Sequence, residues 1–281
     1  MTARRAAKVV RRPSAQSGRS ARERSEHRSR APSRAPTLAA TAETVLARLR
    51  ALADPATREG MARYAISTER AFGIPVPVLR SLAKRIGPDQ GLAHSLWESG
   101  YLEARMLACF VAEPERLSPA EMDRWCRDFD SWAIVDAACY QLFDRSPHAF
   151  GRVTAWARLP GEFQRRAAFS LIAGLAQHDR ATPDGPFRRT FALIERHAAD
   201  GRNFVKKGVS WALRGIGRRN ETLHREALAL ARRLAASGHP AARWVGRDAL
   251  RDLSRGRFRR PRAEGRPGAT RSPRRRAAAR S

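Results

Sequence analysis

The sequence predicts an all-α fold, an α-solenoid of HEAT-like helical repeats. From Ala39 onward the apolar residues recur at helical spacing, and no segment shows the sustained alternation typical of a β-strand. The predicted helices and connections are short, and helix pairs recur roughly every 35 to 45 residues, as in HEAT or armadillo proteins. Sequence identity between the repeats is weak, so a compact helical bundle remains the alternative.

Proline and capping residues set the boundaries of the predicted helices. The first helix ends before Asp54-Pro55, and Pro75 and Pro77 make the connection at 72–77 rigid, with Pro77 expected as the first residue of the next helix. Ser118-Pro119-Ala120-Glu121 forms a capping box. The predicted helices are 41–53, 57–67, 78–86, 93–99, 101–112, 119–129, 131–143, 148–157, 162–177, 187–199, 203–220, 222–236 and 240–253.

Charge divides the chain into a central segment and two basic ends. The formal net charge is +28; segment 1–37 has 11 basic and 2 acidic residues, and segment 255–281 has 11 and 1. Both ends are rich in Arg, Ser, Pro and Ala and have too few large apolar residues to offset chain entropy. We therefore predict disordered basic tails over 1–37 and 255–281, and one folded domain over 38–254.

The positive charge indicates a polyanion, such as nucleic acid, as the partner. A solenoid would offer a concave basic surface for a DNA duplex, and basic tails would add salt-dependent affinity for phosphates. Only four of the basic residues are lysines, so the alternative is that part of the charge reflects the base composition of the genome.

Cysteine usage and hydropathy argue against several other classes of protein. Cys109, Cys126 and Cys139 are odd in number and lie in apolar helical patterns, which predicts free, buried thiols in a reducing compartment and no zinc site. No apolar run has membrane-spanning length. The Arg/Ser-rich start is similar to an organellar transit peptide, but Glu23 and Glu26 argue against one, and we expect a bacterial cytoplasmic protein without metal or cofactor.

The predicted helix 131–143 places an indole and a carboxylate one turn apart. Trp132, Asp136 and Tyr140 share the flank beside the apolar stripe, where an aromatic ring and an acid can meet a ligand. The alternative, which this segment alone favours, is a core tryptophan and a solvated or capping acid. The apolar stripe consists of Ile134, Val135, Ala138 and Leu142.

Two later helices repeat this pattern. In helix 203–220, Trp211 lies away from the apolar stripe together with Lys207, Arg214 and Arg218, which suits a phosphate-binding face. The alternative is that Trp211 packs against a neighbouring repeat, because solenoid helices can bury two faces. In helix 162–177, Arg166 lies opposite the apolar stripe, where an arginine is expected to be exposed.

Five motifs, in this order and spacing, resemble the AlkD-type DNA alkylation-repair glycosylases over about residues 39–253. They are Ala62-Arg63-Tyr64 followed by Gly73-Ile74, Trp132 with Asp136, Phe163-Gln164-Arg165-Arg166-Ala167-Ala168, Lys206-Lys207-Gly208-Val209-Ser210-Trp211-Ala212-Leu213-Arg214, and Gly246-Arg247-Asp248-Ala249-Leu250. The resemblance implies a monomeric solenoid, associated with the nucleoid, that excises N3- and N7-alkylated purines from duplex DNA without a cofactor. It also implies that the duplex lies in the concave groove and that the base is not flipped into a pocket.

The resemblance also implies roles for single residues. Trp132 and Trp211 are expected to lie against the deoxyribose of the lesion, Asp136 to be the catalytic carboxylate, and Arg166 and Arg214 to contact phosphates beside it. The remaining expected DNA contacts are Tyr64, Arg165, Lys206, Lys207, Arg218 and Arg247. Pro75 stands where the family pattern can carry a polar residue near the base pair, which leaves the contact to the opposite strand open.

An alkylated purine of this kind is already cationic, so its glycosidic bond can break without a general acid. The remaining barrier is the positive charge that develops on the sugar, which a carboxylate and aromatic faces stabilise. Two rival functions remain: a non-catalytic HEAT-repeat protein that binds nucleic acid, and an interaction scaffold whose basic tails bind RNA or acidic partners.

Removal of the two basic tails separates these functions. We expect a chain trimmed to 38–254 to bind duplex DNA more weakly than the full chain and to keep lesion recognition, because the tails supply only phosphate affinity. Titration of labelled duplex at low salt measures this. Loss of all duplex binding on trimming would instead favour the scaffold.

Overall fold

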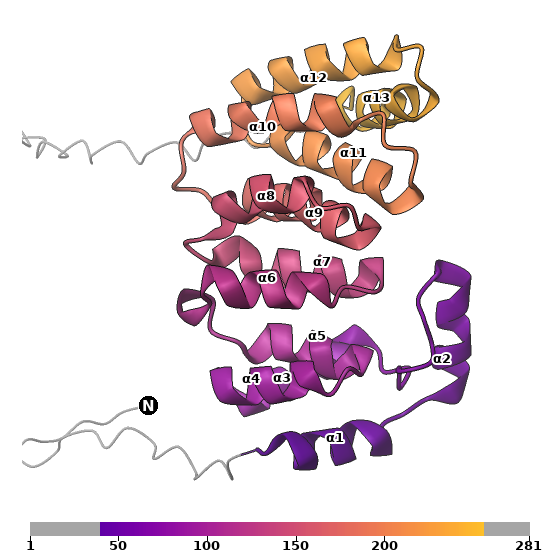
Figure 1. The fold of residues 1–281 in the computed structure, drawn as a ribbon, viewed down its shortest axis with the longest axis vertical. Coiled ribbons are helices and arrows are strands. Elements are labelled where there is room, and N and C mark those ends of the chain that lie inside the picture. The colour runs from indigo at the N-terminus through magenta and orange to yellow at the C-terminus, as the bar shows by residue number, and fades with distance from the viewer. Residues whose placement is uncertain (1–39, 256–281) are drawn as a thin grey trace, which may run out of the picture. The chain divides into compact units, whose positions relative to one another are not determined.

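The computed structural model describes residues 40–255, so the predicted tail 1–37 and all of the predicted tail 255–281 except Arg255 lie outside the described residues. Within this range every predicted helix is present and there is no β-strand (Figure 1). The α-helices are α1 (Ala42–Ala51), α2 (Pro55–Met61), α3 (Val76–Ile86), α4 (Gln90–Glu98), α5 (Leu102–Val111), α6 (Pro119–Arg127), α7 (Trp132–Gln141), α8 (Ala149–Ala157), α9 (Glu162–His178), α10 (Asp184–His197), α11 (Asn203–Gly217), α12 (Glu221–Ala235) and α13 (Pro240–Leu253). Short 3-10 segments are η1 (Ala62–Tyr64), η2 (Pro114–Arg116) and η3 (Phe143–Arg145).

The helices from α4 onward form two parallel rows. One row consists of α5, α7, α9, α11 and α13, and each of these helices packs on the next. The other row consists of α4, α6, α8, α10 and α12, and α4, α8 and α12 also pack on the helix that follows them (Figure 1). Because each pair contacts mainly its neighbours, this arrangement is the predicted α-solenoid and not a compact bundle.

One contact recurs between pairs and supports their equivalence despite weak sequence identity. Arg105 of α5 donates from Nε to the carbonyl oxygen of Trp97, at 3.3 Å, and Arg165 of α9 donates in the same way to Ala157, at 3.2 Å. Both acceptors lie eight residues earlier, at the end of the preceding helix. These arginines satisfy carbonyl groups that have no partner within their own helix.

The apolar core contains an aromatic cluster at the centre of the stack. Trp97 and Trp125 stack with ring centroids 4.0 Å apart, and Phe143 and Trp156 continue the cluster. The buried indoles keep their hydrogen bonds, since Trp97 Nε1 donates to Asp128 and Trp156 Nε1 donates to Asp123. A buried indole N–H without an acceptor would be costly.

Local chemistry explains where the observed helix boundaries differ from the predicted ones. The helix α3 begins at Val76, so Pro77 is its second residue and not its first, and Pro75 is the N-cap. The helix α10 begins at Asp184, three residues before the predicted start, because Asp184-Gly185-Pro186 forms its first turn. The capping box is confirmed: Ser118 Oγ accepts from the Glu121 amide, and Glu121 accepts from the Ser118 amide. Among residues 40–255, no helix combines the length and hydropathy needed to cross a membrane.

The three cysteines are free and buried, as predicted, and burial raises the pKa of each thiol. Because the thiolate is the reactive form, we expect Cys109, Cys126 and Cys139 to resist a thiol reagent in the native protein. In urea all three should react quickly. The measurement is the rate of colour release from a disulfide reagent, and a fast reaction of any thiol under native conditions would contradict this burial.

Candidate active site

Three of the four predicted catalytic residues, Trp132, Asp136 and Trp211, line one cavity of about 390 Å³, whereas the fourth, Arg166, lies behind Asp136 and does not line it. The helix α7 contributes Trp132 and Asp136, and α11 contributes Trp211. The structure therefore brings together an acid and two indoles that are up to 79 residues apart in sequence. The facing wall is largely apolar and includes Met61, Ile66, Ile74, Pro75, Val76, Met106 and Phe110.

Asp136 is held by α9. Arg166 donates from Nε to Oδ1 at 3.0 Å and from Nη2 to Oδ2 at 2.7 Å, and Ser170 Oγ donates to Oδ1 at 2.9 Å. A bidentate, charge-assisted pair of this kind fixes the plane of a carboxylate as well as its position. A carboxylate has about four acceptor sites, so these three donors leave capacity for one more. Asp136 thus has a fixed orientation and can still accept from a water or a ligand in the cavity.

The prediction that Arg166 is exposed was wrong. Its residue exposure is 6 %, and Nη1 donates to the carbonyl oxygen of Phe204 on α11 at 2.9 Å. The reason is that α9 lies between α7, α8 and α11, so every residue from Arg166 to Ala176 is buried. An apolar stripe on a helix identifies one packed face, but α9 packs on all sides. In this structure Arg166 positions Asp136, and its contact with a phosphate stays a prediction.

Trp132 connects α7 to a lightly packed segment, residues 55–64, which we call the α2–η1 segment. Its indole Nε1 donates to the backbone carbonyl of Tyr64 at 2.7 Å. No residue of the α2–η1 segment is buried, and Ala65 closes it with a left-handed φ of 55°. The indole N–H is therefore used within the protein, which leaves the ring faces of Trp132 for contact with a ligand.

Trp211 is held by stacking and is neither fully exposed nor core. It is half-buried, and its ring lies on Tyr140 of α7 with centroids 5.4 Å apart and an interplanar angle of 26°. Both sequence interpretations therefore apply in part: Trp211 packs against a neighbouring repeat, and it also lines the cavity. Tyr140, which shares the flank of Trp132 and Asp136 as predicted, is the residue that joins α7 to α11 here.

The predicted cations on α11 face acids of α13. Arg214 lies 3.7 Å from Asp248 and 3.9 Å from Asp252, and Arg218 forms a 2.5 Å ion pair with Asp252. Ser210 also donates to Asp248, at 2.6 Å. The structure confirms that Arg214 and Arg218 lie outside the core, and it shows that each already has an anionic partner.

Arg165 is likewise engaged within the protein. Its Nη1 pairs with Asp200 at 2.8 Å, and Asp200 also accepts three hydrogen bonds from Arg202, one from its backbone amide and two from its guanidinium. These bonds, first from Arg202 and then from Arg165, hold the pKa of Asp200 well below its usual range. Together with its bond to Ala157, this makes Arg165 a clamp between repeats, and its predicted contact with DNA remains untested.

The remaining predicted DNA contacts are more accessible. Lys207, Arg247 and Tyr64 are exposed, Tyr64 to 69 %. Lys206 is half-buried, with Nζ 5.2 Å from the centroid of the Trp244 ring. These side chains are free to move toward a ligand in a way that Arg165 and Arg166 are not.

Sequence reasoning missed three residues that shape this cavity. Glu103, 1 % exposed, accepts hydrogen bonds from the backbone amides of Phe72, Gly73 and Ile74 and so fixes the loop that carries Pro75. Ser170 contacts Asp136, and Arg80 of α3 lies at the cavity with its guanidinium 4.8 Å from the Phe110 ring. In the loop that Glu103 binds, the sequence feature that indicated an unusual backbone was Gly73, whose φ of 80° favours glycine. Among residues 40–255, no group of His, Cys, Asp and Glu side chains is arranged to hold a metal ion.

Comparison with known proteins identifies the family. The family model described as a DNA alkylation repair enzyme matches residues 45–253. The chain belongs to this family. The match extends from α1 to the end of α13, so it includes every residue that lines the cavity. It also covers the predicted domain 38–254 except for the outermost residues at its two ends.

Solved structures support the fold of this DNA alkylation repair family member. One belongs to a new family of proteins related to the HEAT-like repeat DNA glycosylases with affinity for branched DNA structures; it has a TM-score of 0.66 and 20% identity, over 79% of this chain and 98% of that chain. This likeness confirms the HEAT-like fold class. An engineered protein also matches, with a TM-score of 0.38 and 13% identity over 79% of this chain and 94% of that chain, which is too low to support an argument. A comparison with curated proteins gives no match.

The hydrogen bond from Trp132 to Tyr64 makes a testable prediction about the α2–η1 segment. Trp132→Phe keeps an aromatic ring but removes the N–H, so we expect trypsin to cleave after the exposed Arg58 and Arg63 about threefold to tenfold faster, the scale of one net hydrogen bond. Mass spectrometry of a digestion time course measures each site. Tyr64→Ala is the control, because the acceptor is a backbone carbonyl and remains. Equal cleavage of wild type and Trp132→Phe would show that this bond does not hold the segment.

Proposed function

We propose that this protein hydrolyses the N-glycosidic bond of cationic N3- and N7-alkylpurines in duplex DNA, acting as a monomer. The observation that carries the proposal is the Asp136 carboxylate, fixed by Arg166 and Ser170 in a cavity that Trp132 and Trp211 also line. Membership of a DNA alkylation repair enzyme family supports this class of substrate. The excess of basic residues supports a polyanionic partner.

The chemistry needs little more than these groups. The alkylated base leaves as a neutral molecule because it carries a positive charge before cleavage, and the sugar becomes cationic as the bond breaks. A carboxylate that is already fixed in place stabilises this developing charge without having to move. Electrostatic stabilisation of this preorganised kind is usually the largest single contribution to enzyme catalysis. Indole faces stabilise a cation by their quadrupole, so Trp132 and Trp211 would act on the same sugar.

Each surrounding residue then has a specific role. Arg166 and Ser170 hold Asp136 in one orientation, and the acceptor site that remains on its carboxylate suits the water that attacks the sugar. Arg214 and Arg218 would contact the phosphates of the damaged strand, with Lys206, Lys207 and Arg247 farther along the same side of the row. Arg166 would act through Asp136.

A second candidate function is binding of branched DNA without excision. The observation that favours it is the solved neighbour, which is related to the glycosylases and is described by its affinity for branched DNA structures. At 20% identity this likeness shows the fold alone, so the two functions have to be separated by activity.

The decisive measurement is release of N7-methylguanine from a defined duplex. We expect wild-type protein to release the base, and Asp136→Asn to lower the single-turnover rate by about two orders of magnitude or more while duplex affinity stays nearly unchanged, because only the transition state gains from the negative charge. Base release by chromatography and duplex binding by fluorescence anisotropy give the two quantities.

Asp123→Asn is the matched control. Asp123 also pairs with an arginine, Arg152, at 2.5 Å and accepts from the Trp156 indole, but it lies on α6, outside the cavity. It therefore reports the cost of losing a partly buried ion pair without touching the site. Normal excision by Asp136→Asn would refute the assignment, and branched-DNA binding without any base release by the wild type would favour the second function.

A further inference from the structure

Next to the cavity, but outside its lining, lies a contact between a buried carboxylate and a histidine that the proposed mechanism does not use. Asp144 in η3 contacts Nδ1 of His178, the last residue of α9, through Oδ2. The Asp144 side chain is fully enclosed, and its Oδ1 has no hydrogen-bond partner among the described residues. Gly174 leaves room for it, since a Cβ there would lie 3.0 Å from the Asp144 side chain. A buried carboxylate with a single partner is costly, so its presence calls for a reason.

An aromatic column leads from this pair to the cavity. The His178 ring meets Tyr140 in a T-shaped contact with centroids 4.4 Å apart, and Tyr140 stacks on Trp211. We call the rings of His178, Tyr140 and Trp211, together with Asp144, which contacts His178 at one end, the aromatic column. Its members come from η3, α9, α7 and α11, so it crosses three neighbouring helices of one row.

The two indoles of the cavity are held by different means. Trp132 is fixed by its hydrogen bond to Tyr64, whereas no hydrogen bond within residues 40–255 fixes the Trp211 indole. The position of Trp211 therefore depends on the ring it stacks on. Tyr140 in turn has His178 on one side and Trp211 on the other.

We propose that His178, anchored by Asp144, is a positioning residue for excision: it holds Tyr140 against Trp211 and so sets the place of the indole that faces the lesion sugar. The expected effect on the excision rate rests on the proposed function. The contacts of Tyr140 with His178 and Trp211 do not depend on that function. Burial raises the pKa of Asp144 above its usual value, and the hydrogen bond from His178 opposes that rise. Burial also raises the pKa of the Tyr140 hydroxyl, as does Asp144, which keeps that ring neutral beside Trp211.

The first variant is His178→Asn, whose side-chain amide can still donate to Asp144 near the place of Nδ1. The variant removes the ring edge on Tyr140 without leaving the buried acid unpartnered. We expect the single-turnover excision rate to fall about threefold to tenfold, the range for one aromatic contact, with duplex affinity unchanged. A variant that lost affinity and kept its rate would contradict a positioning role.

Two substitutions of Tyr140 test the stack directly. Tyr140→Phe keeps both ring contacts and is expected to retain the wild-type rate, whereas Tyr140→Leu removes the stacked ring and should lower the rate at least as much as His178→Asn. The pair His178→Asn and Tyr140→Leu should be less than additive, because both act through Trp211. Full additivity, or a defect in Tyr140→Phe equal to that of Tyr140→Leu, would overturn the proposal.

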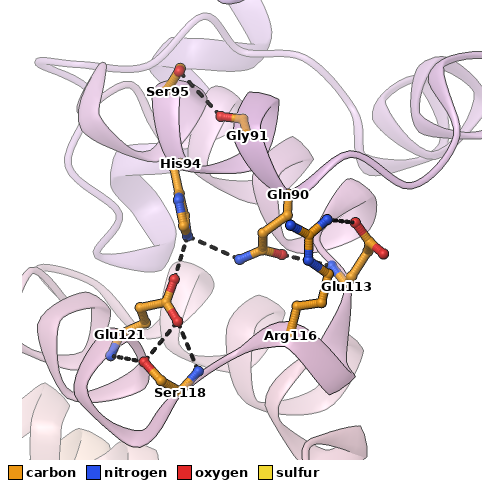
Figure 2. Close-up of polar contacts among 8 residues, drawn as sticks. All are labelled: Gln90, Gly91, His94, Ser95, Glu113, Arg116, Ser118 and Glu121. Carbon is orange, nitrogen blue, oxygen red and sulfur yellow. Dashed lines mark hydrogen bonds and ion pairs between the residues drawn. The ribbon is translucent and has the colours of Figure 1, made fainter.

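The chain contains a closely matched control. His94 of α4 contacts Glu121 of α6 (Figure 2), with 2.8 Å between Nε2 and Oε1. The His94 ring also meets an indole, Trp125, in a T-shaped contact. Its side chain is 30% exposed, against 31% for His178. His94→Asn therefore removes a histidine with the same kinds of neighbours, away from the cavity, and should leave excision unchanged.

A spectroscopic measurement separates this inference from the proposed function. In protein labelled with 5-fluorotryptophan, Trp211→Phe identifies the fluorine resonance of Trp211. We expect His178→Asn and Tyr140→Leu to shift this resonance, and His94→Asn to leave it in place. An unmoved Trp211 resonance in both column variants would overturn the inference. If the resonance moves as expected but wild-type protein releases no base, the proposed function fails and the column contact stands.

Discussion

The bidentate pair between Asp136 and Arg166 is the interaction on which the rest of the site depends. It joins α7 to α9, and the bond from Arg166 to Phe204 extends the connection to α11. Three successive helices of the same row are thus linked by one guanidinium. Such a pair does not add much stability over an apolar contact, but it specifies one arrangement, since removal of either partner leaves an uncompensated charge. The solenoid supplies the burial that makes this geometry rigid, and the pair fixes a carboxylate in the cavity that two indoles also line.

The sequence was sufficient for the fold but only partly so for the site. Helical spacing, capping residues and proline positions are local signals, and they predicted every helix of the described residues. Trp132 and Asp136 were found because they are one turn apart on one helix. Arg166 was placed wrongly because its burial depends on what packs against α9, and Glu103 was missed because its partners are backbone amides about 30 residues earlier. Local periodicity reports one packed face and contains no information on partners that arrive from other helices.

The arrangement of charge suggests how a phosphate backbone would bind. Arg165, Arg214 and Arg218 all have carboxylate partners, so the charge of these three arginines on α9 and α11 is locally balanced before any ligand arrives. An arginine held by an aspartate is already oriented, and it can add a phosphate through the N–H groups that its first partner leaves free. A phosphate at Arg218 would compete with Asp252 or share the guanidinium with it. Affinity for DNA would then depend on the acids of α13 as well as on the cations of α11.

The fold alone does not decide between repair and binding, because a HEAT-like solenoid of the same shape serves either purpose. Three structurally costly features, the enclosed Asp144, the buried Arg166 and the left-handed Ala65, lie in or next to the elements that form the cavity. Each of these features is unfavourable by itself and would be lost from a surface that only had to be basic. A groove for phosphates needs cations, whereas a fixed carboxylate in one cavity with two independently held indoles meets the requirements of a positive charge that forms at one position. That difference favours catalysis over passive binding of DNA.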